Sequence, residues 1–400
     1  MKRQRLALIA PVRTPIGKFG GALAALSAAD LGTAAAKACL ERAGIAGTEI
    51  DQTIFGHARQ AGGGPNTARQ ISFRAGLPAD RPAFTVNQAC GSGLQAIFSA
   101  ARSILLDEAE IVLAGGAESM SNTPYLLPRA RWGYRLGTDE IVDGMYRDGF
   151  VDPLSKLIMG ETAEELASQV GISRSESDAW AQLSQARCEK ARTRGRFDAE
   201  ISPVKLAGKK GEALFSTDEH PRDGVTLESL TKMATVFRDG GTVTAGNASG
   251  ITDGAAAVVV ASEAAAKEHG LAVAGWLLDW EVVGVDPRIM GIGPVPATRA
   301  LLARNGLAFG EIEAVELNEA FASQVVACLN ELPFDRERVN PDGGAIALGH
   351  PIGATGCRIV VTLLHGMAAR DQKLGLATLC ISGGMGIAAL IERTDGWPLS

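Results

Sequence analysis

The sequence lacks the features that would support a disulfide framework, a structural metal site or nucleic-acid binding. Its six cysteines form no Cys-x-x-Cys pair, and none has a histidine at zinc-ligand spacing. No block of basic residues occurs, and the net charge of −6 argues against a nucleic-acid partner. We therefore expect a protein of a reducing, cytoplasmic compartment with no bound metal.

Long hydrophobic runs are missing as well. The longest continuous apolar stretch lies near residues 254–261, far short of the roughly 18 residues that cross a bilayer, so no membrane partner is expected. The N-terminal residues contain a short apolar stretch that runs into Arg13 without a small-residue cleavage site. We predict a first strand at residues 6–10 rather than a signal peptide.

Aromatic residues are few, at 5%, whereas apolar residues reach 46% and charged residues 21%, which is typical of a folded globule. Glycine is abundant, with 48 of the 400 residues, but it follows no three-residue period, which excludes a collagen-like fibre. The length predicts at least two domains, or one domain with large insertions. The glycines predict close backbone approaches, as often found around ligands.

Short apolar runs alternate with stretches of helical period, which indicates an α/β protein. Two parts of the chain follow the same order of strand, strand-to-helix turn, helix and glycine-ended strand. The first runs from residues 53–60 through Cys90 to residues 110–119, and the second from residues 314–324 through His350 to residues 375–384. A duplicated unit of this kind would bring corresponding strand ends to one pseudo-symmetric face.

The sequence between these two parts is more polar and rich in turn residues, which indicates an inserted loop domain. Residues 122–137 carry several aromatic side chains and form either a contact with a partner subunit or a plain surface excursion. We predict three regions: an N-terminal half made of residues 1–120 and 251–270, a loop domain at 121–250, and a C-terminal half at 271–400.

Cys90 lies between a strand-like segment and a helix with apolar residues at the 3.6-residue period. A helix N-terminus favours thiolate over thiol, and Gly91 and Gly93 would leave room for a substrate, so we predict an activated nucleophile. The alternative for a single cysteine is an inert core residue. Gly91, Gly93 and Ala96 also match a dinucleotide-binding pattern, but that pattern lies far into the chain and gives the cysteine no role.

His350 occupies the slot in the second unit that Cys90 occupies in the first, so its imidazole could accept the cysteine proton; the alternative is a helix cap. Cys380 is predicted at the end of a strand, where an acid or base and an oxyanion pocket could be built, or as a buried strand cysteine. Asn318 could hold a catalytic water or cap a helix. Of the remaining histidines, we expect His57 in the core or beside the site. We expect three at the surface, namely His220, His269 and His365.

Four blocks of this sequence together resemble the signature blocks of the thiolases. They are Cys90-Gly-Ser-Gly93, Asn318-Glu-Ala-Phe321, Gly349-His-Pro351 and Cys380-Ile-Ser-Gly-Gly384, in the thiolase order and spacing. Further stretches also look like thiolase sequence, so that the resemblance covers nearly the whole chain: residues 11–21, 159–167, 218–233, 242–257 and 340–356.

The resemblance implies thiolytic cleavage of 3-ketoacyl-CoA by CoA, or the reverse Claisen condensation, by a ping-pong route. Cys90 would accept the acyl group, and His350 would activate the Cys90 thiol. Cys380 would be the acid and base at the α-carbon. One oxyanion pocket would combine His350 with a water on Asn318, and a second would use the backbone N–H groups of Cys90 and Ser382. The implied fold is two βαβ-type halves in five α/β/α/β/α layers, with the inserted loop domain.

The resemblance further implies a homotetramer, or a dimer, and a place in fatty acid metabolism, with CoA as substrate and no tightly bound cofactor. CoA would contact the loop domain at its nucleotide end and along its pantetheine arm. The residues implied are Arg222 and Ser229 at the nucleotide, and Met159, Met233, Phe237, Ala245, Ser249, Ala320 and Phe321 along the pantetheine. The overall negative charge does not attract a polyanion, so local cations such as Arg222 would have to do so.

Two positions depart from the common family pattern. Ile158 stands where short-chain biosynthetic members often carry histidine, which weakens the case for a dedicated acetoacetyl-CoA enzyme. Ser382 stands where many members have glycine, but its N–H is retained. Two other functions are alternatives. A decarboxylating ketoacyl synthase is disfavoured by Cys380, and a non-catalytic acyl-CoA or lipid carrier is disfavoured because no reactive position is lost.

Overall fold

The computed structural model describes residues 4–208 and 211–397; residues 1–3, 209–210 and 398–400, which fall within the three predicted regions, lie outside the described residues. The protein is a mixed α/β structure built around a large sheet, as predicted. The strands are β1 (Leu6–Arg13), β2 (Gly17–Lys18), β3 (Gln52–Gly56), β4 (Ala83–Val86), β5 (Ile111–Ser119), β6 (Tyr125–Leu126), β7 (Val142–Asp143), β8 (Val204–Gly208), β9 (Gly211–Phe215), β10 (Thr252–Ser262), β11 (Val273–Gly284), β12 (Ala314–Leu317), β13 (Leu374–Ile381) and β14 (Met385–Arg393). The α-helices are α1 (Ala28–Ala43), α2 (Thr67–Arg74), α3 (Ser92–Leu105), α4 (Met159–Val170), α5 (Arg174–Thr193), α6 (Leu227–Thr231), α7 (Glu263–Glu268), α8 (Pro294–Asn305), α9 (Ala322–Glu331), α10 (Ala345–Leu348) and α11 (Ile352–Ala369).

The two predicted halves share one continuous hydrogen-bonded sheet. The strand order is β12-β13-β14-β11-β1-β10-β5-β3-β4, and β2 pairs with β10. The halves meet where β1 pairs antiparallel with β11, with Leu6 opposite Leu277. The strands that lead to the reactive loops run parallel to their neighbours, β3 beside β4 and β5, and β12 beside β13. This long-range pairing of β1 with β11 was not evident in the sequence.

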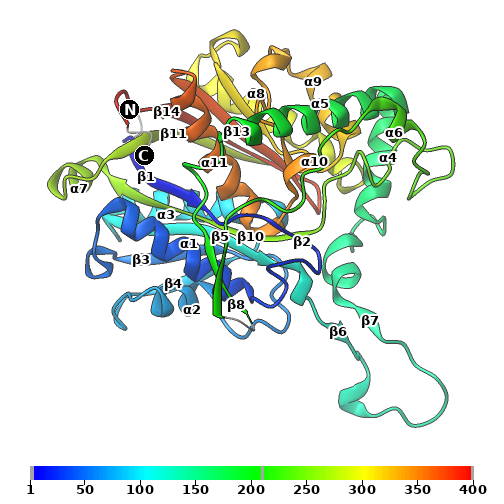
Figure 1. Ribbon diagram of the computed structural model, residues 1–400, viewed down its shortest axis with the longest axis horizontal. Coiled ribbons are helices and arrows are strands. Elements are labelled where there is room, and N and C mark those ends of the chain that lie inside the picture. The colour runs from blue at the N-terminus through cyan, green and yellow to red at the C-terminus, as the bar shows by residue number, and fades with distance from the viewer. Residues whose placement is uncertain (1–3, 209–210, 398–400) are drawn as a thin grey trace.

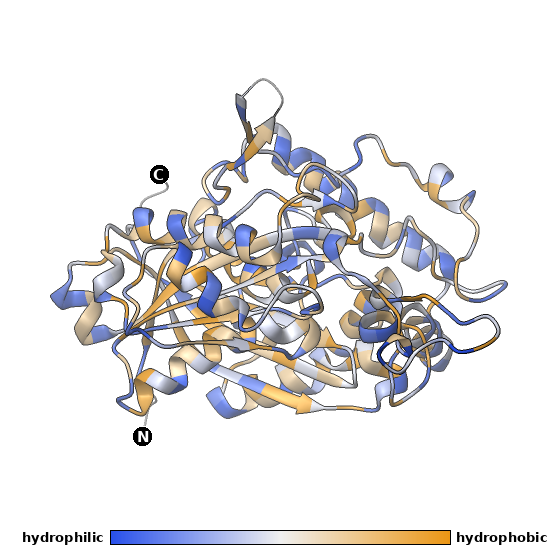
Figure 2. Ribbon diagram, turned by 90° about the horizontal axis from the view of Figure 1, so that it is seen from below, coloured by the Kyte–Doolittle hydropathy of each residue, from blue (hydrophilic) through white to orange (hydrophobic). Residues whose placement is uncertain are grey.

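The five expected layers follow from strands that are buried on both faces. Along β10, Val258 and Val260 pack with α3 and α11 between the two parts of the sheet, whereas Val259 packs with α1 on the outer face. In the other half, Ile387 of β14 faces the central helices and Leu390 faces α8 and α9. Alternating side chains on opposite faces of each strand therefore join three packed cores. Figure 2 shows hydrophobic colour concentrated on these strands and the helices between them.

Helix α11 lies in the central layer, where nearly every one of its side chains is buried. It is the one helix of the described residues that is long and apolar enough to cross a membrane, but 89% of that window is buried inside the protein. In the sequence it does not form a continuous apolar run, because Arg358 and several glycines interrupt it. Its hydrophobicity serves the protein core, because a helix between two sheet layers must be apolar on all sides.

The region between β5 and β10 contributes α4, α5 and two small hairpins. The hairpin of β6 and β7 extends away from the body of the molecule (Figure 1) and exposes Trp132, Tyr134 and Leu136. The same region is tied to the sheet by buried charges. Arg13, at the end of β1, forms ion pairs of 2.7 Å with Glu200 and with Asp218.

The stability of this buried ion network should depend on pH. Burial alone would raise the pKa of Glu200, but Arg13 and Arg196 outweigh it and lower the pKa from 4.5 to about 2. Because the pKa is lower in the folded state, this carboxylate stabilises the fold above about pH 4.5 and loses that effect as the pH falls toward about 2. We expect Glu200→Gln to lower the free energy of unfolding at pH 7 by about 3–5 kcal/mol in urea titrations.

A matched control is Glu263→Gln, which removes a surface pair with Arg5 and should cost at most about 1 kcal/mol. The Glu200 variant should also lose part of the acid sensitivity of the native protein in the same pH window. Equal stability of the two variants at pH 7 would contradict a structural role for the network.

Candidate active site

One cavity of about 230 Å³ is lined by the three reactive side chains that the sequence singled out, Cys90, His350 and Cys380. Cys90 lies in a single turn, η2 (Ala89–Gly91), directly ahead of α3, and His350 lies two residues ahead of α11. Cys380 is near the end of β13. The predicted strands and helices around these residues are therefore confirmed, and the topology brings all three side chains to one place.

Glycines set how closely the two central helices approach each other. A Cβ added at Gly93 of α3 would lie 2.7 Å from the backbone nitrogen of Cys357 and 3.0 Å from the carbonyl oxygen of Gly353, both on α11. At Gly91, a Cβ would meet the side chain of Ile381. The expectation that Gly91 and Gly93 make room for a substrate is therefore wrong. These glycines allow backbone to pack against backbone, which places the two reactive loops next to each other.

The turn that carries Cys90 is strained. Ala89 has a φ of +45°, a region that residues with a Cβ rarely adopt. Two side chains hold it there, because Asn87 accepts a hydrogen bond from the Ala89 N–H and Ser92 donates one to the Ala89 carbonyl. Strain that is held in place by neighbouring bonds is common at functional residues, and here it fixes the direction of the Cys90 side chain.

Burial raises the pKa of the Cys90 thiol, although the backbone N–H of Ser382 and the charge of Arg59 act in the opposite direction. From the helix N-terminus alone, the pKa of Cys90 was expected to be lowered. That expectation is wrong. Desolvation outweighs the helix because the side chain is packed among apolar residues of the cavity wall. In the free protein Cys90 is therefore a neutral thiol with an N–H donor beside its sulfur.

His350 is held as a neutral base. Burial, together with the charges of Arg358 and Arg59, lowers its pKa from 6.5 to about 3. Its Nδ1 lies 2.6 Å from the Thr355 hydroxyl, which already donates its own proton to the carbonyl of Pro351. The hydroxyl oxygen must therefore accept a proton from Nδ1, which leaves the lone pair on Nε2. Nε2 is buried and has no hydrogen-bond partner among the described residues.

Cys380 is 1% exposed, and burial and the nearby Cys90 raise its pKa well above 9.0, so its thiol keeps its proton. Asn318 follows β12 and is equally buried. Neither the nitrogen nor the oxygen of its side-chain amide finds a partner among the described residues, so it does not act as a helix cap. Asn318 is not among the residues that line the cavity.

The residues implied for CoA divide into two groups. Five of them line the cavity: Met159, Phe237, Ser249, Ala320 and Phe321. Four do not, namely Arg222, Ser229, Met233 and Ala245. Arg222, Ser229 and Ala245 are exposed, and the Ser229 hydroxyl donates to the carbonyl of Thr226. Ile158 and Ser382 also line the cavity.

Sequence reasoning missed several residues of this cavity, among them Arg59, Tyr146 and Phe150. Arg59 lies in a loop, and Tyr146 and Phe150 lie in a single short helical turn, so neither segment is long enough to show a periodic pattern. It also missed Glu118, a fully buried carboxylate at the end of β5. Glu118 accepts hydrogen bonds from the backbone N–H groups of Ala58, Arg59 and Gly353. The sequence signal that could have identified Glu118 is a charged residue near the end of an otherwise apolar strand.

The other histidines do not line the cavity. His57 is buried beside the site, 3.2 Å from Glu118, as expected. His365 is wrongly predicted at the surface, because it is 3% exposed and bonds to the carbonyl of Pro11.

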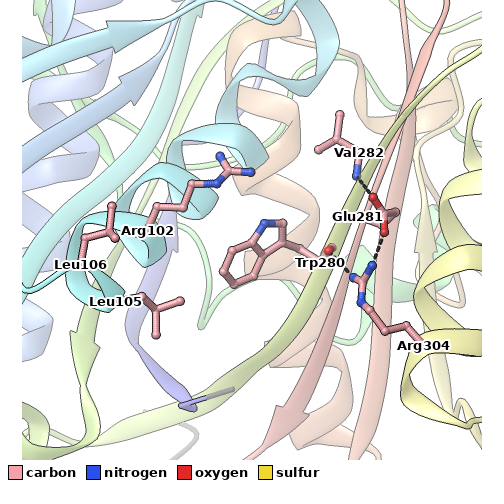
Figure 3. A pocket seen from close by; sticks show the side chains of 7 residues that line it. All are labelled: Arg102, Leu105, Leu106, Trp280, Glu281, Val282 and Arg304. Atoms are coloured by element: carbon pink, nitrogen blue, oxygen red, sulfur yellow. Dashed lines mark hydrogen bonds and ion pairs between the residues drawn. The ribbon is translucent and has the colours of Figure 1, made fainter. Parts of the chain in front are cut away.

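A second hollow of about 450 Å³ opens beside Trp280 and Arg304 (Figure 3) but is lined by neither cysteine nor histidine. In that hollow Arg304 forms an ion pair with Glu281.

Two family models match most of this chain. The model described as the N-terminal domain of thiolase matches residues 6–264, and the model described as the C-terminal domain of thiolase matches residues 271–393. The chain is 49% identical over 387 residues to an acetyl-CoA acetyltransferase of Cupriavidus necator, covering 96% of this chain and 98% of that relative. An acetyl-CoA acetyltransferase of Escherichia coli is also 49% identical, with 97% and 99% covered.

Solved structures agree with these sequence relatives. The crystal structure of the Bacillus anthracis acetyl-CoA acetyltransferase matches with a TM-score of 0.96 at 43% identity and covers 98% of this chain and 100% of that chain. The crystal structure of human mitochondrial 3-ketoacyl-CoA thiolase in complex with CoA matches with a TM-score of 0.94 at 42% identity, covering 98% of each chain.

The neutral state and the proton position of His350 can be measured by 15N NMR of the five labelled histidines. A pKa of about 3 keeps the neutral ring populated at pH 5, with the proton on Nδ1. We expect Thr355→Val to redistribute the proton between the two nitrogens, because the acceptor is lost, and Thr355→Ser to leave it on Nδ1. The His350→Asn variant assigns the signal. An imidazolium signal of His350 at pH 5 would contradict this assignment.

Proposed function

The chain belongs to the thiolase family and is an acyltransferase, and on this premise we propose which residues carry out its reaction. The function is thiolytic cleavage of 3-ketoacyl-CoA by CoA, the reverse condensation of two acyl-CoA molecules, or both. The observation that carries the assignment of residues is the single cavity in which Cys90, His350 and Cys380 meet.

The first half-reaction starts from neutral groups. The Cys90 thiol gives its proton to Nε2 of His350 as the sulfur attacks carbon 3 of the 3-ketoacyl-CoA. The bond between carbons 2 and 3 then breaks, and its electron pair passes to carbon 2, which takes a proton from Cys380 to release acetyl-CoA. A neutral imidazole with a free Nε2 and a second thiol that keeps its proton suit these two roles.

In the second half-reaction, the Cys380 thiolate accepts the thiol proton of CoA as the CoA sulfur attacks the acyl group. The Cys90 sulfur then leaves and takes back its proton from Nε2 of His350, which restores the free enzyme. Two oxyanions form on the way. We assign one to the backbone N–H groups of Cys90 and Ser382, because the Ser382 N–H already lies beside the Cys90 sulfur. We assign the other to Nε2 of His350 and a water on Asn318, whose buried amide requires a partner of this kind.

The geometry favours short acyl groups. A cavity of about 230 Å³ is smaller than the usual range of about 300–1,000 Å³ for a drug-sized ligand, so the pantetheine arm leaves little room for a long chain. We place the arm along Met159, Phe237, Ser249, Ala320 and Phe321. Residues closer to the surface would meet the rest of CoA, namely Arg222, Ser229, Met233 and Ala245.

We retain the three-part division of the chain as a proposal, with residues 121–250 as the unit that holds CoA. This region provides Met159, Phe237 and Ser249 to the cavity wall. We further propose a homo-oligomer, with a tetramer favoured over a dimer, because the β6–β7 hairpin exposes Trp132 and other large apolar side chains. The six free cysteines fit a reducing compartment, for which we propose the cytoplasm and a role in fatty acid metabolism.

Replacement of the nucleophile tests the assignment directly. Cys90→Ala should abolish the CoA-dependent loss of acetoacetyl-CoA, measured by absorbance, because no acyl-enzyme can form. It should also abolish acid-stable labelling of the protein by radioactive acetyl-CoA. Cys39→Ala, which removes a buried thiol outside the cavity, is the matched control and should keep both. Labelling of the Cys90 variant at the level of wild type would end the assignment.

Replacement of the second thiol should separate the two chemical steps. In Cys380→Ala the labelled acyl-enzyme should still form from acetyl-CoA, because acylation from a thioester needs no proton transfer at carbon 2. Turnover of acetoacetyl-CoA should fall by about 10²–10⁴-fold, the usual effect of losing an acid or base. Loss of labelling together with turnover would show instead that Cys380 supports the fold of the cavity.

A further inference from the structure

One charged side chain in the cavity has no part in the reaction described above. Arg59 lines the cavity and is only 7% exposed. Its guanidinium makes one side-chain hydrogen bond, from Nη1 to the carbonyl oxygen of Asp148 at 3.2 Å. Nε is fully buried and finds no partner among the described residues. Buried charges in proteins are normally paired, so a guanidinium in this state is unusual.

No carboxylate of the described residues forms an ion pair with Arg59. Glu118 is near enough to act through space, but its oxygens already accept from three backbone N–H groups and lie 3.2 Å from His57. The side chain of Asp148 is half exposed and lies beside Arg147 instead. The positive charge is therefore not neutralised by direct contact inside the protein.

The structure nevertheless holds Arg59 in a fixed position. Its guanidinium occupies the space that a Cβ on Gly149 would fill, and it lies 6.0 Å from the centre of the Phe150 ring. Phe150 is in turn held edge-on by Tyr146. These three residues belong to one helical turn, η5 (Tyr146–Phe150). A preorganised guanidinium whose Nε lacks a hydrogen-bond partner among the described residues can bind a ligand at little entropic cost.

Two separate apolar clusters contribute to the walls of the cavity. One contains Met159, Phe237 and Phe321 together with Cys380, where we place the pantetheine arm. The other contains Ala58, Met145 and Ile352, and Cys90 and Phe150 pack against it. Arg59 follows Ala58 and lies beside Phe150, so it belongs to the wall that carries the nucleophile. A group bound by Arg59 is therefore part of the acyl chain carried by Cys90 rather than part of CoA.

Resting on the function proposed above, we propose that Arg59 binds a carboxylate at the end of a short acyl chain, so that the substrate class is 3-ketoacyl-CoA with a terminal carboxylate. The guanidinium donates two parallel hydrogen bonds, from Nε and from one Nη, to the two carboxylate oxygens. The positive charge thereby gains the partner that it lacks in the free protein. The small cavity and the charged wall disfavour a longer apolar chain, whose end would have to bury Arg59 without a partner.

The test compares two substrates of equal length, 3-oxoadipyl-CoA, which ends in a carboxylate, and 3-oxohexanoyl-CoA, which ends in a methyl group. Wild type should cleave the carboxylate substrate with a kcat/KM about 10- to 100-fold higher, as expected for a charged hydrogen-bonded pair. Arg59→Met should abolish or reverse this ratio, and Arg59→Lys should retain part of it. The ratio is the readout because any effect of Arg59 on Cys90 acts on both substrates alike.

Arg147→Met is the matched control, because it removes a half-exposed positive charge from the same turn without touching the cavity. It should leave the ratio unchanged. The proposal is overturned by a wild-type preference for the methyl substrate, by a ratio that Arg59→Met leaves unchanged, or by an equal effect of Arg147→Met. Failure of wild type to cleave either substrate would contradict the proposed function itself.

Discussion

The site depends on the contact between the backbones of α3 and α11 in the central layer. Each helix starts directly after a reactive loop, so the distance between the helices fixes the distance between Cys90 and His350. Gly93 on α3 and Gly356 on α11 allow a separation that a Cβ at either position would not permit. Strands from both halves of the chain pack against these two helices. The distance between Cys90 and His350 is therefore set by the packing of the whole core and not by the loops alone.

Burial then sets the chemistry that this geometry can perform. Cys90 and Cys380 keep their protons, and His350 stays neutral, so the free cavity holds no ion pair among its reactive groups. Proton transfer is therefore delayed until a thioester enters and the developing charge meets N–H donors. Glu118 supports this arrangement because it ties the loop at residues 58–59 to the first turn of α11 through Gly353. One buried carboxylate thus joins both halves beneath the site.

Local patterns allowed the reactive residues to be predicted from the sequence, because a strand, a glycine-rich turn and a periodic helix are each visible within about 30 residues. The pairing of β1 with β11 could not be predicted, since nothing in either strand specifies a partner so distant. The raised pKa of Cys90 depends on burial by several segments and is equally non-local. Arg59 was missed for a related reason: an arginine in an irregular loop looks like a surface residue until its neighbours are known.

Chemistry and selectivity come from different segments of the cavity lining. The reactive groups stand on the central helices and strands, where any change would disturb packing on both sides. Much of the lining comes instead from residues 146–160 and 236–251, most of which are less deeply buried. Arg59, which is bonded to the first of these segments through the carbonyl of Asp148, can remain a buried charge because its unfavourable burial is relieved whenever an anionic group binds. Burying Arg59 without a partner destabilises the free protein, and only substrates with an anionic group remove this unfavourable free energy. The site therefore prefers such substrates.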